Sequence, residues 1–132
     1  MTTRMVRDAM TKGTINVSEN WPLSDAARLL DTYHVSGVPV IDRVGHLVGV
    51  LSQTDILRAR VIDHLWKALP GLAVRHLMTA PAFTAREDTP IDEAVMLMEE
   101  RQIHRLVVVA EDGYTPIGML STSDVVHELV RR

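Results

Sequence analysis

The chain has 132 residues, of which 46% are hydrophobic and 23% charged, and its formal net charge at pH 7 is −3. This balance is typical of a folded globular protein and excludes a disordered chain, whose apolar content would not offset the entropy of ordering. The chain has no cysteine, which excludes disulfides, thiolate metal sites and cysteine nucleophiles. No apolar run approaches the roughly 18 residues of a membrane span, the first five residues lack the apolar stretch of a secretory signal, and the charge disfavours nucleic acid. We therefore expect a cytoplasmic protein with neither a membrane nor a nucleic acid as partner.

The first half of the chain begins with a predicted helical turn, Val6–Met10, and a short extended segment, Ile15–Val17. A helix follows, because apolar residues recur at the i, i+3, i+4 and i+7 spacing of one helix face. The residues of that face are Leu23, Ala26, Ala27 and Leu30.

Two apolar runs come next, Val38–Ile41 and Leu47–Leu51, and the turn between them contains Gly45. Such a pair predicts a β-hairpin. A second helix is expected to begin after Ser52 and to end near Ala68, before the break at Pro70-Gly71. The order of elements is therefore β-α-β-β-α.

The second half repeats this order, with a helical turn at Val74–Met78 and an extended segment at Phe83–Ala85. Its first helix should be capped by Thr89, with Pro90, Asp92 and Glu93 in the first turn. The apolar face of that helix carries Ile91, Ala94, Val95 and Met98. The hairpin is expected at Leu106–Val109 and Ile117–Leu120 around Gly113, and the last helix is expected to begin after Ser121 and to run to the C-terminus.

The two halves are also similar residue by residue. Val6-Arg7-Asp8-Ala9-Met10-Thr11 recurs as Val74-Arg75-His76-Leu77-Met78-Thr79, 68 positions later, and after one inserted residue Gly49–Asp55 recurs as Gly118–Asp124, 69 positions later. We infer a tandem duplication with one motif in residues 1–68 and one in residues 69–132. Half of this chain would make a marginal core, so we predict an α/β (α+β) fold in which both motifs pack through their sheets as one intertwined unit.

The strongest local motif is the run of glycine, two apolar residues, serine, any residue, Ser or Thr, and Asp, which occurs once in each motif. One interpretation is purely structural: Ser52 and Ser121 cap a helix, with Asp55 and Asp124 as the acidic partners of a capping box. The other interpretation is a nucleotide site. Hydroxyl groups and free N–H groups at a helix N-terminus suit a phosphate, and a carboxylate can accept both hydroxyls of a ribose.

A second motif is Ile103-His104-Arg105-Leu106, directly before a predicted strand. Arg105 can hold phosphate oxygens through its planar guanidinium, and His104 can add a charge-assisted hydrogen bond. The alternative is an ordinary solvated loop. The matching residues of the first motif are Ser36-Gly37, so that any basic contact with a phosphate is confined to one motif.

The remaining candidates favour structural roles. The other histidines lack the spacing of metal ligands, the methionines fit a core, and Trp66 suits either a core or a dimer contact. The sequence has no nucleophile elbow, Walker loop or dinucleotide loop. We therefore expect neither catalysis nor a catalytic cofactor.

These motifs together resemble the CBS domain, named after cystathionine β-synthase, and the chain looks like a stand-alone tandem CBS pair. The matching residues are Asp8–Thr11, Val35–Asp42 and Gly49–Asp55 in the first motif, and His76–Thr79, Ile103–Val109 and Gly118–Asp124 in the second. Ile103–Val109 is also similar to the AMP-binding repeat of the AMP-activated protein kinase gamma subunit.

The resemblance implies two clefts that bind AMP, ADP, ATP or S-adenosylmethionine, each formed by residues of both motifs. One cleft would use Ser52, Thr54, Asp55, Ala82, Phe83, Thr84, His104, Arg105 and Val107. The other would use Ser121, Ser123, Asp124, Thr14, Ile15, Asn16, Ser36, Gly37, Val38 and Pro39, with His104 within reach of its phosphate.

The function that the resemblance implies is a non-catalytic regulatory module that senses an adenine nucleotide, and hence cellular energy, and forms a homodimer. It would act on an unknown regulated protein. The alternative is a dimeric protein-interaction scaffold whose clefts are vestigial.

Overall fold

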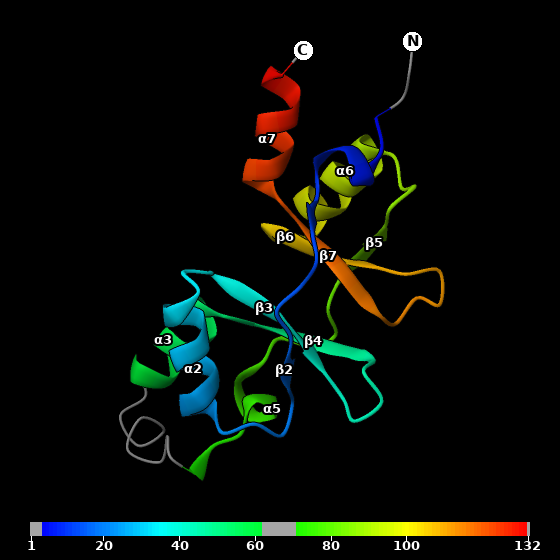
Figure 1. The fold of residues 1–132 in the computed structure, drawn as a ribbon. Coiled ribbons are helices and arrows are strands. Elements are labelled where there is room, and N and C mark those ends of the chain that lie inside the picture. The colour runs from blue at the N-terminus through cyan, green and yellow to red at the C-terminus, as the bar shows by residue number, and fades with distance from the viewer. Residues whose placement is uncertain (1–3, 62–70, 132) are drawn as a thin grey trace. The chain divides into compact units, whose positions relative to one another are not determined.

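The computed structural model of the chain describes residues 4–61 and 71–131, and it confirms the mixed α/β fold class (Figure 1). Its elements in chain order are α1 (Val6–Ala9), β1 (Thr11–Lys12), β2 (Val17–Ser18), α2 (Leu23–Thr32), β3 (Gly37–Ile41), β4 (Leu47–Ser52), α3 (Gln53–Val61), α5 (Val74–Leu77), β5 (Thr84–Arg86), α6 (Ile91–Arg101), β6 (Arg105–Val109), β7 (Pro116–Ser121) and α7 (Thr122–Val130). The expected helices and hairpins are all present, whereas β1 was not predicted. Trp66 and the expected helix end near Ala68 lie outside the described residues.

The chain divides into two compact units. Unit 2 comprises residues 15–82 and holds a three-stranded sheet with the order β2-β3-β4. Unit 1 comprises residues 83–132 together with the first 14 residues of the chain, and holds a four-stranded sheet with the order β1-β7-β6-β5. In each unit an antiparallel hairpin pairs in parallel with one short strand, β2 with β3 and β5 with β6.

The hairpins form where the sequence places apolar runs around a glycine. Gly45 and Gly113 have φ angles of +88° and +82°, a left-handed conformation that L side chains rarely adopt. The strands then bury their apolar side chains against the helices of the same unit. Leu23, Leu30, Val38, Val40 and Leu51 are part of the core of unit 2, and Ala94, Met98, Leu106, Val108 and Leu120 are part of the core of unit 1.

The compact units do not follow the repeat boundaries of 1–68 and 69–132, because the opening helices of the two repeats are exchanged. Val6, in the opening helix of the first repeat, is fully buried in the core of unit 1. Val74, in the opening helix of the second repeat, is fully buried in the core of unit 2. Each unit therefore needs a segment from both repeats to complete its core.

The exchanged segments also complete the N-termini of two helices. The first N–H of α6, from Ile91, donates to the carbonyl of Arg4 at 3.0 Å, and that of α2, from Leu23, donates to Leu72 at 2.8 Å. The prediction that Thr89 caps α6 is wrong. Pro90 is the N-cap residue and has no side-chain bond, while the hydroxyl of Thr89 accepts the N–H of Arg86 at 2.9 Å. The exchanged backbone takes the place of the capping side chain.

Each exchanged segment crosses the second hairpin strand of its unit, β4 or β7, directly over a glycine. A Cβ atom on Gly49 would lie 2.8 Å from the carbonyl oxygen of Thr79, and one on Gly118 would lie 2.6 Å from that of Thr11. At this crossing, Val50 and Thr79 exchange two backbone hydrogen bonds of 2.9 Å, and Thr11 pairs with Met119. Only glycine permits so close an approach between two backbones.

A buried ion pair joins the first exchanged segment to unit 1. Arg4 donates to Glu128, which lies on α7 and is buried, and Arg131 approaches the second oxygen of the same carboxylate at 3.5 Å. The matching positions of the other repeat are Leu72 and Ala59, both apolar. The two units therefore share one architecture with different chemistry at this position.

We predict that Gly118→Ala lowers the free energy of unfolding by about 1–3 kcal/mol, because the new methyl group would overlap a carbonyl oxygen in a packed backbone crossing. Gly49→Ala should behave similarly. The control is Gly71→Ala, where a Cβ meets no atom within 4 Å. Urea denaturation followed by circular dichroism measures all three. A Gly118→Ala protein as stable as Gly71→Ala would contradict the close crossing.

Candidate functional site

Both Ser-x-x-Asp motifs lie where the last strand of a unit passes into a helix. In unit 1, the N–H of Asp124 donates to Ser121 Oγ at 3.1 Å and the N–H of Ser121 donates to Asp124 Oδ2 at 2.9 Å. In unit 2, Ser52 and Asp55 form the same pair of bonds, at 3.2 and 2.9 Å. The structural interpretation of this motif, a capping box, is thus confirmed in both repeats. It uses only one oxygen of each carboxylate.

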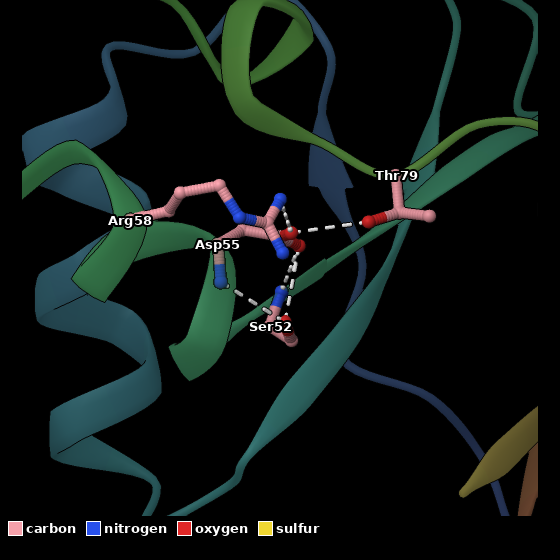
Figure 2. A network of polar contacts seen from close by, with 4 residues as sticks. All are labelled: Ser52, Asp55, Arg58 and Thr79. Carbon is pink, nitrogen blue, oxygen red and sulfur yellow. Dashed lines mark hydrogen bonds and ion pairs between the residues drawn. The ribbon is translucent and has the colours of Figure 1, made fainter. Parts of the chain in front are cut away.

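The second oxygen of Asp55 is also occupied, as Figure 2 shows. Thr79 Oγ1 donates to Asp55 Oδ1 at 3.0 Å, and the guanidinium of Arg58 approaches the same oxygen at 3.3 Å. The Ser52 hydroxyl adds a bond of 3.1 Å to Oδ2. Asp55 is only 1% exposed, so its carboxylate is fully engaged within unit 2.

The second oxygen of Asp124 is in a different situation. Asp124 is half-buried, and no residue in the described ranges 4–61 and 71–131 donates to its Oδ1. The hydroxyl of Ser121 lies 3.0 Å from that of Ser123. Unit 1 therefore presents a free carboxylate oxygen and two neighbouring hydroxyls at the N-terminus of α7.

The expected basic residues of the second repeat lie at the same end of unit 1. Arg105 begins β6 and is paired in register with Ser121 on β7. The backbone carbonyl of His104 accepts the N–H of Thr122, in the first turn of α7, at 3.0 Å, and its side chain is exposed. In unit 2 the matching carbonyl, that of Ser36, accepts the N–H of Gln53 at 2.9 Å. Only in unit 1 does the segment that leads into the first hairpin strand thus bring basic residues to the Ser-x-x-Asp motif, because the matching residues of unit 2 are Ser36 and Gly37.

The other expected site residues differ in burial. Val38, Pro39 and Val107 are buried, Thr14, Ile15, Gly37, Ala82 and Thr84 are half-buried, and Thr54 is exposed. Phe83 is half-buried, with the guanidinium carbon of Arg101 5.1 Å from its ring centroid, and its carbonyl accepts the N–H of Val107 at 3.2 Å. Each unit brings its Ser-x-x-Asp motif together with the segment that leads into its first hairpin strand. That segment is His104-Arg105 in unit 1 and Ser36-Gly37 in unit 2.

Asn16 is the one expected site residue with a buried atom that lacks a partner. Its Oδ1 is buried and makes no hydrogen bond in the described part of the chain. Leaving such an acceptor unsatisfied costs about 1–3 kcal/mol. A water or a ligand that donates to Oδ1 would recover this free energy.

Unit 1 also carries two hollows. A groove of about 320 Å³ between α6 and α7 is lined mainly by apolar residues, among them Val95, Met98, Val125 and Leu129, and includes His104. A second hollow, of about 510 Å³, is lined by Arg7, Arg86, Glu87, Asp88 and Glu111, and by no expected site residue.

Thr79 and Arg58 contact an expected site residue but were not predicted as part of the site. Thr79 belongs to the Met-Thr pair that recurs in both repeats, and this recurrence was the available signal. Arg58 lies three residues after Asp55, one turn along α3, which is the spacing of an ion pair on a helix. No group of three potential metal ligands is present within residues 4–61 and 71–131, and none of the helices there is long and apolar enough to cross a membrane.

The duplicated architecture and the motifs agree with a comparison against protein families. The CBS domain family matches twice, over residues 6–62 and 74–131. The chain belongs to the CBS domain family.

Two curated relatives match this chain over part of a longer protein. An L-aspartate semialdehyde sulfurtransferase of Methanocaldococcus jannaschii is 27% identical over 121 residues, which are 92% of this chain and 22% of the relative. An inosine-5'-monophosphate dehydrogenase of the same organism is 30% identical over 118 residues, which are 89% of this chain and 22% of that enzyme. The chain thus spans about a fifth of the length of these relatives.

Solved CBS pairs have the same fold. CBSX2 of Arabidopsis thaliana, solved in complex with AMP, is 32% identical, with a TM-score of 0.82 over 96% of both chains. The CBS domain pair of protein MJ0100, in complex with 5'-methylthioadenosine and S-adenosyl-L-methionine, is 24% identical, with a TM-score of 0.84 over 97% of both chains.

We predict that Ser121→Ala lowers the free energy of unfolding by about 0.5–2 kcal/mol, since it removes the acceptor for the N–H of Asp124. Ser123→Ala is the control, because Ser123 is exposed and lies outside the capping box; its effect should stay within about 0.5 kcal/mol. Thermal and urea denaturation measure both. Equal stability of the two variants would mean that the cap does not stabilise α7.

Proposed function

We propose that this CBS pair is a non-catalytic regulatory module that binds an adenosyl ligand, namely AMP, ADP, ATP or S-adenosylmethionine. The observation that carries the proposal is the free Oδ1 of Asp124 beside the hydroxyls of Ser121 and Ser123. A carboxylate oxygen accepts ribose hydroxyls, and the N-terminus of α7 favours a negatively charged phosphate.

The basic residues of unit 1 support a phosphorylated ligand. Arg105 is the cross-strand neighbour of Ser121, and its guanidinium can form two parallel bonds with phosphate oxygens. His104, at the same helix N-terminus, adds a second donor when protonated. A phosphate near Ser121 would thus find donors from the helix and from His104.

The unsatisfied Asn16 Oδ1 supports an adenine base. It is an acceptor, and the exocyclic amino group of adenine is a donor, whereas hypoxanthine presents a carbonyl oxygen at that position. A site that leaves a buried polar group unpaired discriminates strongly against such an analogue. In this proposal, Asn16 favours AMP over IMP.

The sites themselves are proposed as composite clefts of the two repeats, as the resemblance implies. The Asp124 site would include Thr14, Ile15, Asn16, Ser36, Gly37, Val38 and Pro39, and the Asp55 site would include Ser52, Thr54, Ala82, Phe83, Thr84, His104, Arg105 and Val107. CBSX2 supports the ligand class, because it is 32% identical and was solved with AMP. Energy sensing in the cytoplasm, by way of an unidentified regulated protein, is the proposed role.

A homodimer is the second part of the proposal, and one surface of unit 1 favours it. Val126, Leu129 and Val130 are exposed on α7, as are Val95 and Met96 on α6, and Val126 and Leu129 line one groove with Val95. At the positions of unit 2 that match Val126 and Val130, Leu57 and Val61 are also exposed and apolar. Exposed apolar patches of this kind mark interaction surfaces, and their recurrence in both repeats suits a self-complementary contact with a second copy.

We predict that AMP raises the melting temperature, because a ligand at a hundredfold excess over its Kd stabilises the folded state by about 2.7 kcal/mol. Asp124→Asn should weaken AMP binding about 10- to 150-fold, the cost of a lost hydrogen bond to a charged group, and IMP should bind more weakly than AMP. Titration calorimetry measures these affinities. The control is Asp31→Asn, at an exposed position of α2.

Two results would contradict the proposed site. Equal AMP affinity of the wild type and Asp124→Asn would remove Asp124 from it. If none of AMP, ADP, ATP and S-adenosylmethionine gave a heat of binding, and the protein formed a stable dimer, the protein-interaction scaffold would be favoured instead.

For the dimer, we predict that the double substitution Val126→Glu and Leu129→Glu yields a monomer, because it would bury two unpaired charges in an apolar contact. Sedimentation equilibrium measures the mass. The control is Val44→Glu, at an exposed hairpin turn of unit 2, which should leave the dimer intact. A dimer that survives the double substitution would exclude this surface.

A further inference from the structure

We propose that the two ligand-binding aspartates respond at different ligand concentrations, because Thr79 and Arg58 form a latch that keeps Asp55 occupied in the free protein. The site of Asp124 then fills first and the site of Asp55 second. This inference rests on the proposed function and adds an order of occupancy to it.

The latch is a complete set of protein partners around one buried carboxylate (Figure 2). Asp55 Oδ2 accepts the backbone N–H and the hydroxyl of Ser52, and Oδ1 faces the hydroxyl of Thr79 and the guanidinium of Arg58. A ribose hydroxyl can reach Oδ1 only by replacing one of these donors. Binding at Asp55 therefore exchanges existing hydrogen bonds for new ones, and the net gain is small.

Unit 1 has the same backbone geometry without the latch. Thr11 occupies the position of Thr79 and crosses β7 as Thr79 crosses β4, and His127 occupies the position of Arg58. In the described chain, neither the hydroxyl of Thr11 nor the ring of His127 bonds to Asp124. A ribose hydroxyl at Asp124 Oδ1 forms its bond without breaking another within the protein.

The latch can open with little movement of the chain. The backbone of Thr79 is held by two hydrogen bonds of 2.9 Å to Val50, so rotation of its side chain is sufficient to release Asp55. The side chain of Arg58 is 60% exposed and can turn into solvent. Thr79 therefore acts as a positioning residue that sets the affinity of the site without leaving its place in the fold.

The experiment is titration calorimetry of the full chain with AMP, in two backgrounds that isolate the sites. Asp124→Asn leaves the latched site, and Asp55→Asn leaves the open one. We expect AMP to bind the open site at least about tenfold more tightly, since a hydrogen bond to a charged group changes an equilibrium constant about 10- to 150-fold.

Removing the latch should raise the affinity of its own site only. Thr79→Val, in the Asp124→Asn background, should tighten AMP binding about tenfold, while Thr79→Ser keeps the hydroxyl and should change little. The matched control is Thr11→Val in the Asp55→Asn background, which should leave AMP affinity unchanged. Arg58→Gln and His127→Gln form a second matched pair at exposed positions, in case Thr79→Val impairs folding.

The outcomes separate the latch from the proposed function. The latch is overturned, and nucleotide binding left intact, if the two sites bind AMP with equal affinity. It is likewise overturned if neither Thr79→Val nor Arg58→Gln raises the AMP affinity of the Asp55 site. The absence of any heat with AMP, ADP, ATP or S-adenosylmethionine in the wild type overturns the proposed function and the latch with it.

Discussion

The close crossing of two backbones over Gly49 and Gly118 is the constraint on which the rest of the structure depends. At each crossing, a segment from one repeat lies against the second hairpin strand of the other, where an added Cβ atom would lie 2.8 or 2.6 Å from a carbonyl oxygen. The same segment inserts a fully buried valine into the core and supplies the carbonyl that completes a helix N-terminus. The crossing precedes the Ser-x-x-Asp motif by only a few residues, so the exchanged segment also determines what surrounds the aspartate.

The capping box and the nucleotide site, which are alternatives at the level of sequence, are compatible in three dimensions because a carboxylate has two oxygens. Oδ2 of each aspartate accepts the backbone N–H of the N-cap serine, which holds the carboxylate at the end of the strand. Oδ1 is then available for another donor. A cap that fixes the side chain before a ligand arrives reduces the conformational entropy lost on binding, so the structural role supports the proposed binding role.

Patterns that are local in the sequence predicted most of the fold and part of the site. The apolar spacing that begins at Leu23 and Ile91 predicted α2 and α6, the runs around Gly45 and Gly113 predicted the hairpins, and both capping boxes follow from residues three positions apart. The features that sequence reasoning missed are non-local. The pairing of β1 with β7, the capping of α6 by Arg4 rather than by Thr89, and the bond from Thr79 to Asp55 each join residues at least 24 positions apart. No periodicity within one repeat indicates which repeat will supply the partner.

Comparison of the two repeats separates what the architecture requires from what each unit can vary. Glycine at the crossing and the Ser-x-x-Asp pair are the same in both, because the close approach permits no side chain and the helix N-terminus needs an acceptor. The positions around the carboxylate differ: Arg58 and Ser36-Gly37 in unit 2 correspond to His127 and His104-Arg105 in unit 1. These substitutions remove the guanidinium that engages the aspartate and place His104 and Arg105 at the start of the neighbouring strand, β6. One architecture thus holds an occupied carboxylate in one unit and an open one, next to basic side chains, in the other, which is the asymmetry that ordered binding of two ligands requires.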